Sequence, residues 1–286
     1  MSTSKKTILV TGCSAGGIGA AVAHELAKHG HYVYATARTT SKIPAELSGL
    51  PNVTTLQLDV ASDDSVREAA RAVSENSAAR GLDVLVNNAG YGYTMPLLDV
   101  DIAHAQRLYD TNLWGPLRTI QAFSDLLIAS QGRVVNISSV GAAVNTPWIG
   151  VYASSKAALN SLSDTLRLEL APFNVSIVTI MVGTVATPFH TNEPDVVLPP
   201  SSRYTSIRDT INSWAKGEAG PKGGSVEEFA KSIVEDIVGN GKNAQVWKGA
   251  NSGIVRFVSR WVPSSILDGM MSSGQGLDEL SKSLQK

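Results

Sequence analysis

Cysteine is almost absent from this chain: Cys13 is the single one among 286 residues. One cysteine cannot form an internal disulfide, so a reducing compartment is the simplest expectation. Histidine is also scarce, because the chain has five and none stands at ligand spacing with cysteine or a carboxylate. We therefore expect no metal site.

An excess of charge of either sign is missing as well. Lys and Arg number 24 against 25 Asp and Glu, and the net charge of -1 creates no basic field that would attract nucleic acid. No run approaches the roughly 18 apolar residues of a membrane-spanning helix. The apolar run after the polar residues 1–6 is too short for a signal-peptide core. The sequence predicts a cytoplasmic protein that neither binds nucleic acid nor crosses a membrane as a helix.

Short runs rich in β-branched residues alternate with helix-length segments from Thr7 onward. The expected strands are Thr7–Thr11, Tyr32–Thr36, Val53–Leu58, Leu82–Val86, Arg133–Ile137, Val175–Met181 and Ala244–Trp247. The expected helices are Gly19–His29, Asp63–Ala79, Asp101–Ser130 with an interruption near Gly115–Pro116, Gly150–Ala171 and Val226–Val238. Such alternation gives right-handed crossovers. We expect one domain over residues 1–286, a Rossmann-type α/β fold with a doubly wound parallel sheet of about seven strands and helices on both faces.

The alternation breaks between Thr187 and Ser225. This segment is rich in Pro, Gly and Ser and holds one amphipathic stretch, Tyr204–Lys216. Long irregular segments of compact domains are often functional loops over a binding site. We therefore expect residues 188–225 to form a substrate lid.

The tail, residues 249–286, is expected to be helical, and two interpretations of it remain open. Its apolar side could close the substrate pocket or pack on the sheet edge. Alternatively, it could lie on a membrane surface, with Trp261 at headgroup level and Arg256 and Arg260 against anionic lipid. The residues of the expected apolar stripe are Ile254, Val255, Phe257, Val258, Trp261 and Val262.

A glycine-rich turn, residues 11–19, follows the first expected strand and opens into the first helix. Side chains at its glycines would keep the backbone away from a pyrophosphate, and the N–H groups and dipole of a new helix favour an anion. Strand, turn and helix in this order predict a dinucleotide site. The residues expected to contact the dinucleotide there are Gly12, Ser14, Gly17, Ile18 and Gly19.

Arg38 and Thr39 stand at the end of the second strand, where NAD-binding folds place an acidic residue. An arginine can pair with a 2′-phosphate, and no carboxylate is present there to repel one. We therefore expect NADPH/NADP as the cofactor. The alternative is that Arg38 is an ordinary solvated charge.

Four further segments accompany the glycine turn: Asn87-Asn88-Ala89-Gly90, Asn112 with Gly115, Ser138-Ser139, and Tyr152-Ala153-Ser154-Ser155-Lys156. Together these motifs resemble the short-chain dehydrogenase/reductase family over about residues 7–187. The Tyr-x-x-x-Lys pair placed after Ser139 makes the resemblance specific. It implies an enzyme whose catalytic residues are Asn112, Ser139, Tyr152 and Lys156.

Tyr152 and Lys156 are one helical turn apart and so project from the same face. A neighbouring ammonium favours the phenolate and lowers the pKa of Tyr152 from its reference value of about 10. The resemblance implies that Ser139 holds a substrate carbonyl, that Tyr152 gives it a proton, and that Asn112 holds a water linking Lys156 to solvent. Taken singly, each residue also has a structural explanation, such as a helix cap for Ser139 or a kink at Asn112.

The same resemblance implies further cofactor contacts. Asp59 could equally cap the helix that begins near Asp63. Gly183 lacks the proline that usually precedes it in the family, which leaves the rigidity of its loop open. The glycine turn is one residue longer than is common. The implied contacts are Asp59 and Val60 around the adenine, Asn88, Ala89 and Gly90 under the cofactor, Val185 and Thr187 at the carboxamide, and Tyr152 and Lys156.

Within the family, the sequence is similar to the 1-acyldihydroxyacetone-phosphate reductases and related fungal NADPH-dependent reductases. This similarity rests on residues 33–38, 172–175 and 183–187 and on the unusual stretch 246–251. It implies a carbonyl reductase for a hydrophobic ketone, such as 1-acyldihydroxyacetone phosphate or a secondary-metabolite ketone. It favours a peripheral contact of the tail with endoplasmic reticulum or lipid droplets but leaves both interpretations of the tail open. The family resemblance as a whole implies a homo-oligomer.

Two other functions stay open at this point. A hydroxysteroid- or polyketide-type reductase would use the same catalytic residues and differ in the lid. A non-catalytic NADP(H)-binding sensor would bind the cofactor without turnover, although the intact Ser139, Tyr152 and Lys156 argue against it.

Overall fold

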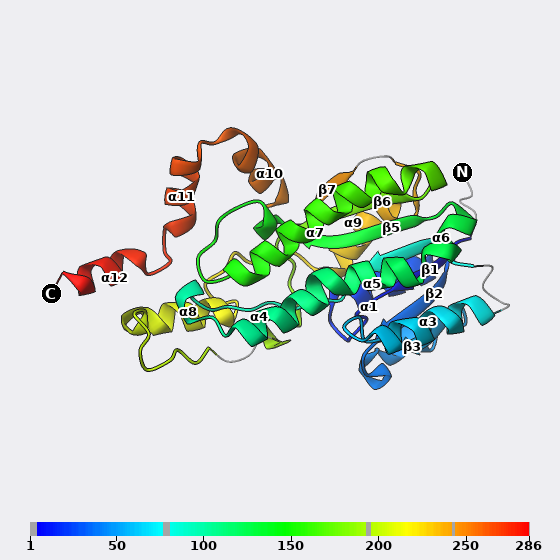
Figure 1. Ribbon diagram of the computed structural model, residues 1–286, viewed down its shortest axis with the longest axis horizontal. Coiled ribbons are helices and arrows are strands. Elements are labelled where there is room, and N and C mark those ends of the chain that lie inside the picture. Colours follow the sequence, from blue (N-terminus) through cyan, green and yellow to red (C-terminus); the bar gives the residue numbers. More distant parts are fainter. Residues whose placement is uncertain (1–4, 77–80, 193–195, 242–243, 286) are drawn as a thin grey trace.

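Seven strands form one sheet in the order β3-β2-β1-β4-β5-β6-β7 (Figure 1). The computed structural model describes residues 5–76, 81–192, 196–241 and 244–285. The strands are β1 (Thr7–Val10), β2 (Tyr32–Ala37), β3 (Val53–Gln57), β4 (Val84–Asn87), β5 (Arg133–Ser139), β6 (Ser176–Val182) and β7 (Gln245–Lys248). All neighbouring strands run parallel. The predicted doubly wound sheet is confirmed. Its order reverses between β1 and β4, and such sheets bind ligands at the carboxyl ends of the strands beside the reversal.

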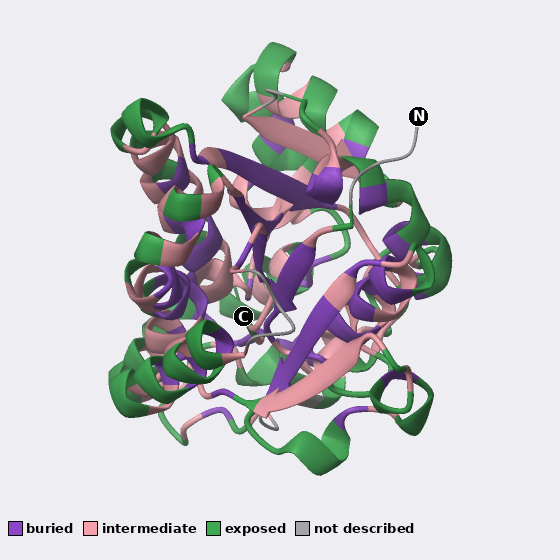
Figure 2. Ribbon diagram, turned by 90° about the vertical axis from the view of Figure 1, so that its right-hand side faces the viewer, coloured by how far each residue is buried: buried purple, intermediate pink, exposed green. Residues whose placement is uncertain are grey.

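Successive residues of β1 contribute to two separate cores, because side chains of a strand alternate between its faces. Ile8 and Val10 lie in one core and Leu9 in the other. The first core is covered by α1 (Ile18–Lys28), α2 (Ala45–Ser48) and α9 (Val226–Val238). The second is covered by α3 (Asp63–Glu75), α5 (Gly115–Ala122), α6 (Ser124–Ser130) and α7 (Gly150–Glu169). Figure 2 shows the buried sheet between these two layers of outward-exposed helices.

Strands β5 and β6 extend further than the sequence predicts. Ser138 pairs with Met181 and Ser139 with Val182, so the ladder continues to the carboxyl edge of the sheet. Ser139 is therefore the last residue of β5 and stands where ligands of such a sheet bind.

The predicted interruption of the long helix 101–130 takes a different form. Helix α4 (Ile102–Tyr109) continues into a π-helical turn, η3 (Asp110–Trp114), and then into α5. The backbone therefore departs from the α-helix one turn before Gly115–Pro116, and a second break follows at Phe123. Pro116 is the second residue of α5, directly after the π-helical turn.

The segment predicted to be a lid contains the short helices η6 (Pro188–Asn192), η7 (Thr205–Ile207) and α8 (Arg208–Ala215). A bridge between Val185 and Gly224 fixes both of its ends. Pro188 lies against the glycine turn, since a Cβ on Gly16 would come 3.0 Å from Pro188 Cγ. The function as a lid stays a prediction, and residues 193–195 lie outside the described residues.

The tail forms α10 (Ser252–Trp261), α11 (Ser264–Ser272) and α12 (Leu277–Leu284), an arm that runs past α8 (Figure 1). Helix α10 contacts β7 at the sheet edge, and α12 packs on η7. The predicted apolar stripe divides along α10. Val255 and Val258 are half-buried, whereas Ile254, Phe257 and Trp261 are 64%, 61% and 74% exposed.

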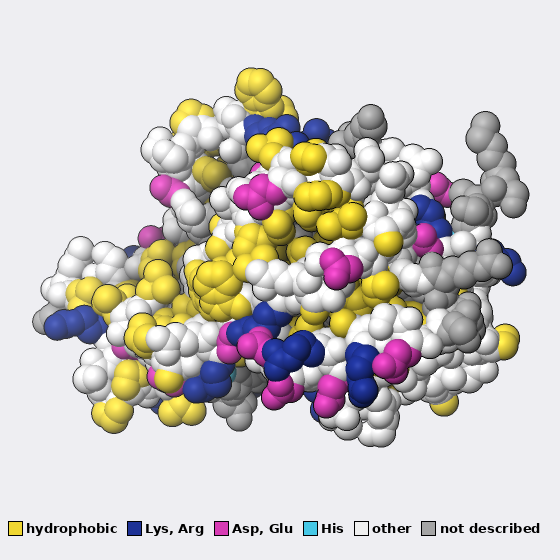
Figure 3. Space-filling model, turned by 45° about the vertical axis from the view of Figure 1, so that its right-hand side comes forward, with side chains coloured by type: hydrophobic (Ala, Val, Ile, Leu, Met, Phe, Trp, Pro, Cys, Tyr) yellow, Lys and Arg dark blue, Asp and Glu magenta, His cyan; other side chains and the backbone are white. Residues whose placement is uncertain are grey.

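Hydrophobic side chains also gather across the middle of one face of the molecule (Figure 3). Large apolar side chains are exposed on the second helical layer, among them Trp114 of η3 and Leu168 of α7. In the described parts of the chain, no helix combines the length and apolar character needed to cross a bilayer.

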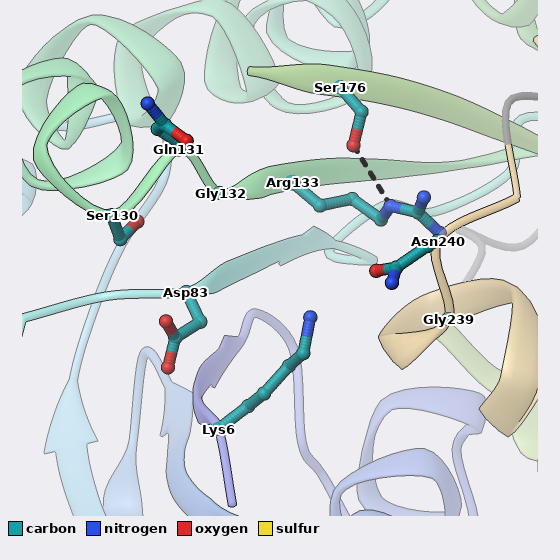
Figure 4. A pocket seen from close by; sticks show the side chains of 9 residues that line it. All are labelled: Lys6, Asp83, Ser130, Gln131, Gly132, Arg133, Ser176, Gly239 and Asn240. Carbon is teal, nitrogen blue, oxygen red and sulfur yellow. Dashed lines mark hydrogen bonds between the residues drawn. The ribbon is translucent and has the colours of Figure 1, made fainter. Parts of the chain in front are cut away.

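A polar pocket lies at the opposite, amino-terminal edge of the sheet (Figure 4). Its main side chain is Arg133, which is 6% exposed. Arg133 donates from Nε to Ser176 Oγ (3.0 Å), from Nη1 to Asp236 O (2.8 Å) and from Nη2 to Gly241 O (2.8 Å). These bonds fasten the start of β5 to the end of α9, so the pocket serves the fold and holds no predicted site residue.

Candidate active site

The glycine turn lies at the carboxyl end of β1 and leads directly into α1. Gly12 has a φ of +75°, and a Cβ there would come 2.9 Å from Ala89 Cα. A Cβ on Gly19 would come 2.4 Å from Asn88 Nδ2 and 2.5 Å from Gly12 O. Only glycine fits these two positions. The turn is thus pressed against the loop that follows β4.

Thr11 joins the turn to that loop. Its Oγ1 accepts the backbone N–H groups of Asn88 (2.9 Å) and Ala89 (3.0 Å), and Asn88 Nδ2 donates to Thr11 O (2.8 Å). Sequence reasoning singled out Asn88, Ala89 and Gly90 but not Thr11. A hydroxyl residue at the strand end directly before the glycines is the signal that could have found it.

The exposed edge of the turn offers backbone N–H groups to an anion. Residues 14–16 are exposed, and the N-terminus of α1 has no side-chain cap. The N–H groups of its first turn, which begins at Ile18 after Gly17, are therefore available to an anion. The predicted contacts Ser14, Gly17 and Ile18 all border this edge.

Arg38 and Thr39 follow β2 directly and are exposed. In the described ranges no ion pair involves Arg38, so its guanidinium is not already bound to a carboxylate. Such a charge is available to a ligand phosphate.

Asp59 and Val60 follow β3. Asp59 Oδ1 accepts the N–H of Ala61 (3.0 Å), and buried Val60 packs against Gly115. The cap of α3 is Ser62, whose side chain accepts from the backbone N–H of Ser65. Asp59 therefore does not cap this helix, a second use compatible with cofactor binding, and the cofactor role of Asp59 stays a prediction.

Asn112 is fully buried in the π-helical turn. Its Oδ1 accepts the N–H of Tyr91 (3.1 Å), and its Nδ2 donates to Tyr91 O (3.0 Å) and Ser155 Oγ (3.2 Å). A Cβ on Gly90 would lie 3.0 Å from Asn112 Oδ1 and 3.5 Å from Lys156 Nζ. The side chains of Asn112 and Lys156 therefore both lie close to Gly90. A water relay between Asn112 and Lys156 stays a prediction.

Ser139 and Tyr152 border a common residue, Gly141. A Cβ on Gly141 would lie 3.4 Å from Ser139 Oγ and 3.9 Å from Tyr152 Cε1. The N–H of Gly141 donates to Ser139 Oγ (3.1 Å). Because the serine oxygen accepts this bond, its own proton can be donated to a ligand.

Lys156 lies one turn beyond Tyr152 on α7 and is only 5% exposed. Its Nζ donates to Ile137 O (2.9 Å). Burial lowers the pKa of Lys156 from 10.5 to about 8, because the low-polarity interior disfavours the charged form. An ammonium that loses its proton this easily is unusual for a structural lysine.

Val185 and Thr187 follow β6. The N–H of Gly183 donates to Lys248 O (2.8 Å), and Val185 forms the bridge to Gly224. The loop is therefore fastened by backbone hydrogen bonds although it lacks the family's proline. Contact of Val185 and Thr187 with a carboxamide stays a prediction.

A buried chain of hydrogen-bonded polar side chains links the helices and strands that carry the site. Thr119 donates to Asn87 Oδ1 (2.7 Å), Asn87 donates to Asn136 Oδ1 (2.9 Å), and Asn136 donates to Ser163 Oγ (2.8 Å). This chain connects α5, β4, β5 and α7. Sequence reasoning did not single out Asn136, although a polar residue inside an otherwise apolar strand is a signal for such a role.

Metal ligands do not gather at this site. Within residues 5–76, 81–192, 196–241 and 244–285, no group of three or more His, Cys, Asp or Glu side chains could hold a metal ion. The lone thiol, Cys13, is buried, and burial raises its pKa to about 12.

Residues 6–196 match the protein family described as short chain dehydrogenase. The chain belongs to the short-chain dehydrogenase family. This short-chain dehydrogenase is an oxidoreductase that binds a nicotinamide cofactor and acts on a small molecule.

Its relatives are similar over nearly the whole chain. "Short-chain dehydrogenase ptmH" of Penicillium ochrochloron is 40% identical over 265 residues, which are 92% of this chain and 96% of that protein. The "NADPH-dependent 1-acyldihydroxyacetone phosphate reductase" of Schizosaccharomyces pombe is 36% identical over 249 residues, 85% of this chain and 82% of that protein. The predicted similarity to fungal reductases of this kind is confirmed.

A solved structure has the same architecture. A short-chain dehydrogenase from Burkholderia cenocepacia in complex with NADP superposes with a TM-score of 0.75 at 24% identity, covering 95% of this chain and 99% of that one. At this identity the likeness concerns the fold.

We predict that replacing Lys156 by Met stabilises the protein without cofactor. A lysine whose pKa is lower in the folded than in the unfolded chain opposes folding while it is charged. At neutral pH the variant should gain about 3 kcal/mol in free energy of unfolding, at about 1.4 kcal/mol for each unit of pKa shift. The gain should shrink as pH rises through about 8 toward 10.5.

Urea unfolding of both proteins across this pH range measures the effect. Lys231→Met, at an exposed position of α9, is the matched control and should change little. A Lys156→Met protein less stable than wild type at neutral pH would show that the ammonium is held by attractive contacts stronger than its cost of burial.

Proposed function

We propose that this chain is an NADPH-dependent carbonyl reductase for a hydrophobic ketone. The observation that carries the proposal is the buried Lys156 ammonium one turn from Tyr152, beside a serine oriented by the backbone of Gly141. This arrangement offers two hydrogen donors to one carbonyl oxygen.

Each residue then has a defined task. Ser139 donates its proton in a hydrogen bond to the ketone oxygen, since Ser139 Oγ already accepts from Gly141. Tyr152 donates the proton that turns this oxygen into a hydroxyl. Lys156 favours the phenolate that Tyr152 becomes, through its positive charge in a low-polarity interior. The reduced nicotinamide, when bound, supplies the hydride to the carbonyl carbon.

The apolar surroundings favour a hydrophobic substrate. Val151, the neighbour of Tyr152, and Trp148 lie in one apolar cluster with Leu198, Ile207 and Ile211 of the proposed lid. An acyl-dihydroxyacetone phosphate or a secondary-metabolite ketone is compatible with these walls, and a hydroxysteroid- or polyketide-type ketone is the alternative. A non-catalytic NADP(H) sensor would not need the arrangement of Ser139, Tyr152 and Lys156.

NADPH is supported by Arg38, which is exposed and forms no ion pair among the described residues, and by two similar proteins whose names contain NADPH or NADP. A homo-oligomer is also proposed, through the helical face that exposes Trp114 and Leu168. Sedimentation velocity reports the oligomeric state. A cytoplasmic location stays a prediction.

Tyr152→Phe should abolish ketone reduction while leaving the Kd for NADPH nearly unchanged, because only the transferable proton is removed. We expect kcat to fall at least about 100-fold. Stopped-assay kinetics and NADPH fluorescence titration measure the two quantities. Tyr109→Phe, which removes a hydroxyl bonded to Ser154 of the same helix α7, is the control. A Tyr152→Phe enzyme with near-normal kcat would refute the assignment of the proton donor.

Arg38→Asp should reverse the cofactor preference toward NADH, because attraction to a 2′-phosphate is replaced by repulsion. The ratio of kcat/KM for NADPH and NADH measures this preference. Arg67→Asp, at an exposed position of α3, should leave the ratio unchanged. Preference for NADH in the wild type would contradict the argument.

We also propose that α10 touches an anionic lipid surface from which the ketone is collected. Its three exposed apolar residues, Ile254, Phe257 and Trp261, share the helix with Arg256 and Arg260, and α10 carries no acidic residue. Apolar bulk beside unopposed positive charge complements anionic headgroups. Helix α10 also contacts the loop after Ser139, so the surface would lie near the site.

Flotation with vesicles that contain phosphatidylserine tests this contact. Wild type should float, and Ile254→Ser/Phe257→Ser/Trp261→Ser should not, because these positions are exposed and the fold does not need them. Leu98→Ser/Leu284→Ser, two exposed apolar positions outside α10 and outside the proposed oligomer face, is the control. Wild type that does not float with the vesicles would contradict the proposal, as would a triple variant whose oligomeric state without lipid differs from that of wild type.

A further inference from the structure

Gly141 occupies a special place beside the two groups that would face the ketone oxygen. It lies in η4 (Val140–Ala142), the turn that follows Ser139. The Cβ that it lacks would lie 3.4 Å from Ser139 Oγ, 3.8 Å from Ile149 Cδ1 and 3.9 Å from Tyr152 Cε1. A side chain at residue 141 would thus occupy the space next to the position proposed for the carbonyl group of the ketone.

Backbone conformation does not explain the glycine. The φ of Gly141 lies outside the left-handed range, so an L-residue can adopt it. Contacts of 3.4 to 3.9 Å are ordinary van der Waals distances, so alanine fits without displacing a neighbour. Gly12 and Gly19, by contrast, are required by close backbone approaches.

The ring of Tyr152 has an aromatic neighbour from the segment after β6. Phe189 of η6 meets it edge to face, with ring centroids 5.5 Å apart at 65°. Phe189 is half-buried, and the preceding Pro188 lies against Gly16 of the glycine turn. The Tyr152 ring therefore lies between the aromatic ring of Phe189 and the space that Gly141 leaves because it has no side chain.

We propose that Gly141 is a specificity-determining residue that admits ketones whose carbonyl is part of a ring or directly attached to one. This inference rests on the proposed ketone reduction. The carbonyl oxygen of any substrate must reach both Ser139 and Tyr152. In an open-chain ketone the carbon chain beyond the carbonyl can rotate away from Gly141. A ring holds its atoms fixed beside the carbonyl and needs the volume left by Gly141. The Phe189 ring offers such a flat substrate an apolar contact.

Steady-state kinetics with NADPH on ketones matched in carbon number test the proposal. The pairs are 1-tetralone with 2-decanone and cyclohexanone with 2-hexanone. Wild type should prefer the ring ketone of each pair. Gly141→Ala should lower kcat/KM for 1-tetralone by about 10-fold or more, as an added methyl group does in a filled pocket. Its kcat/KM for 2-decanone should change by less than about 3-fold, and the Kd for NADPH should stay constant.

Three further variants separate substrate size from other causes. Gly269→Ala has open space around its added Cβ and is the matched control. Phe189→Leu should raise KM for the ring ketones more than for the open-chain ones, and Phe189→Tyr, which keeps the ring, should restore the preference.

Equal losses on both ketones of a pair in Gly141→Ala would overturn the inference, because they would indicate a displaced Ser139 rather than a filled subsite. Unchanged kinetics would overturn it too. A wild type that binds NADPH but reduces no ketone of the panel would instead count against the proposed function, and the inference would fall with it.

Discussion

A positive charge buried without a carboxylate is the constraint on which this site depends. Across the described ranges no ion pair involves Lys156, and its ammonium donates to a single carbonyl oxygen, that of Ile137. A charge in such a place opposes folding unless the surroundings compensate it. Selection for stability alone would remove it. The position of Lys156 is understandable if the charge acts on Tyr152, one turn away on the same helix.

The loop after β4 connects this charge to the proposed cofactor site. At its start, Asn88 and Ala89 bind the hydroxyl of Thr11, directly before the glycine turn. At its end, Tyr91 is bound through both backbone groups by Asn112. The π-helical turn aims Asn112 at this backbone, and such turns are frequent at functional sites. One short segment thus sets the distance between the pyrophosphate edge and the reacting groups.

Local patterns were sufficient to predict the strands, the glycine turn and the placement of Tyr152 and Lys156 one turn apart on one helix, because each follows from spacing within one element. Features made by distant segments were not predictable. The π-helical turn depends on contact between Asn112 and the backbone of Tyr91. The low pKa of Lys156 depends on its burial, which cannot be predicted from a charged residue in a helical pattern. The division of the α10 stripe depends on which face meets β7. The sequence around Gly141 does not indicate that it lies next to both Ser139 and Tyr152 in the fold.

Direct titration of Lys156 tests the central claim, that a buried and easily deprotonated ammonium stands beside Tyr152. The measurement is NMR of protein with ¹³Cε-labelled lysine, without cofactor, with Lys156→Met used to assign the resonance. One lysine should titrate with a midpoint near 8 and be missing from the variant. If every lysine instead titrates near the ordinary value of about 10.4, the ammonium is solvated and the account of the site is wrong.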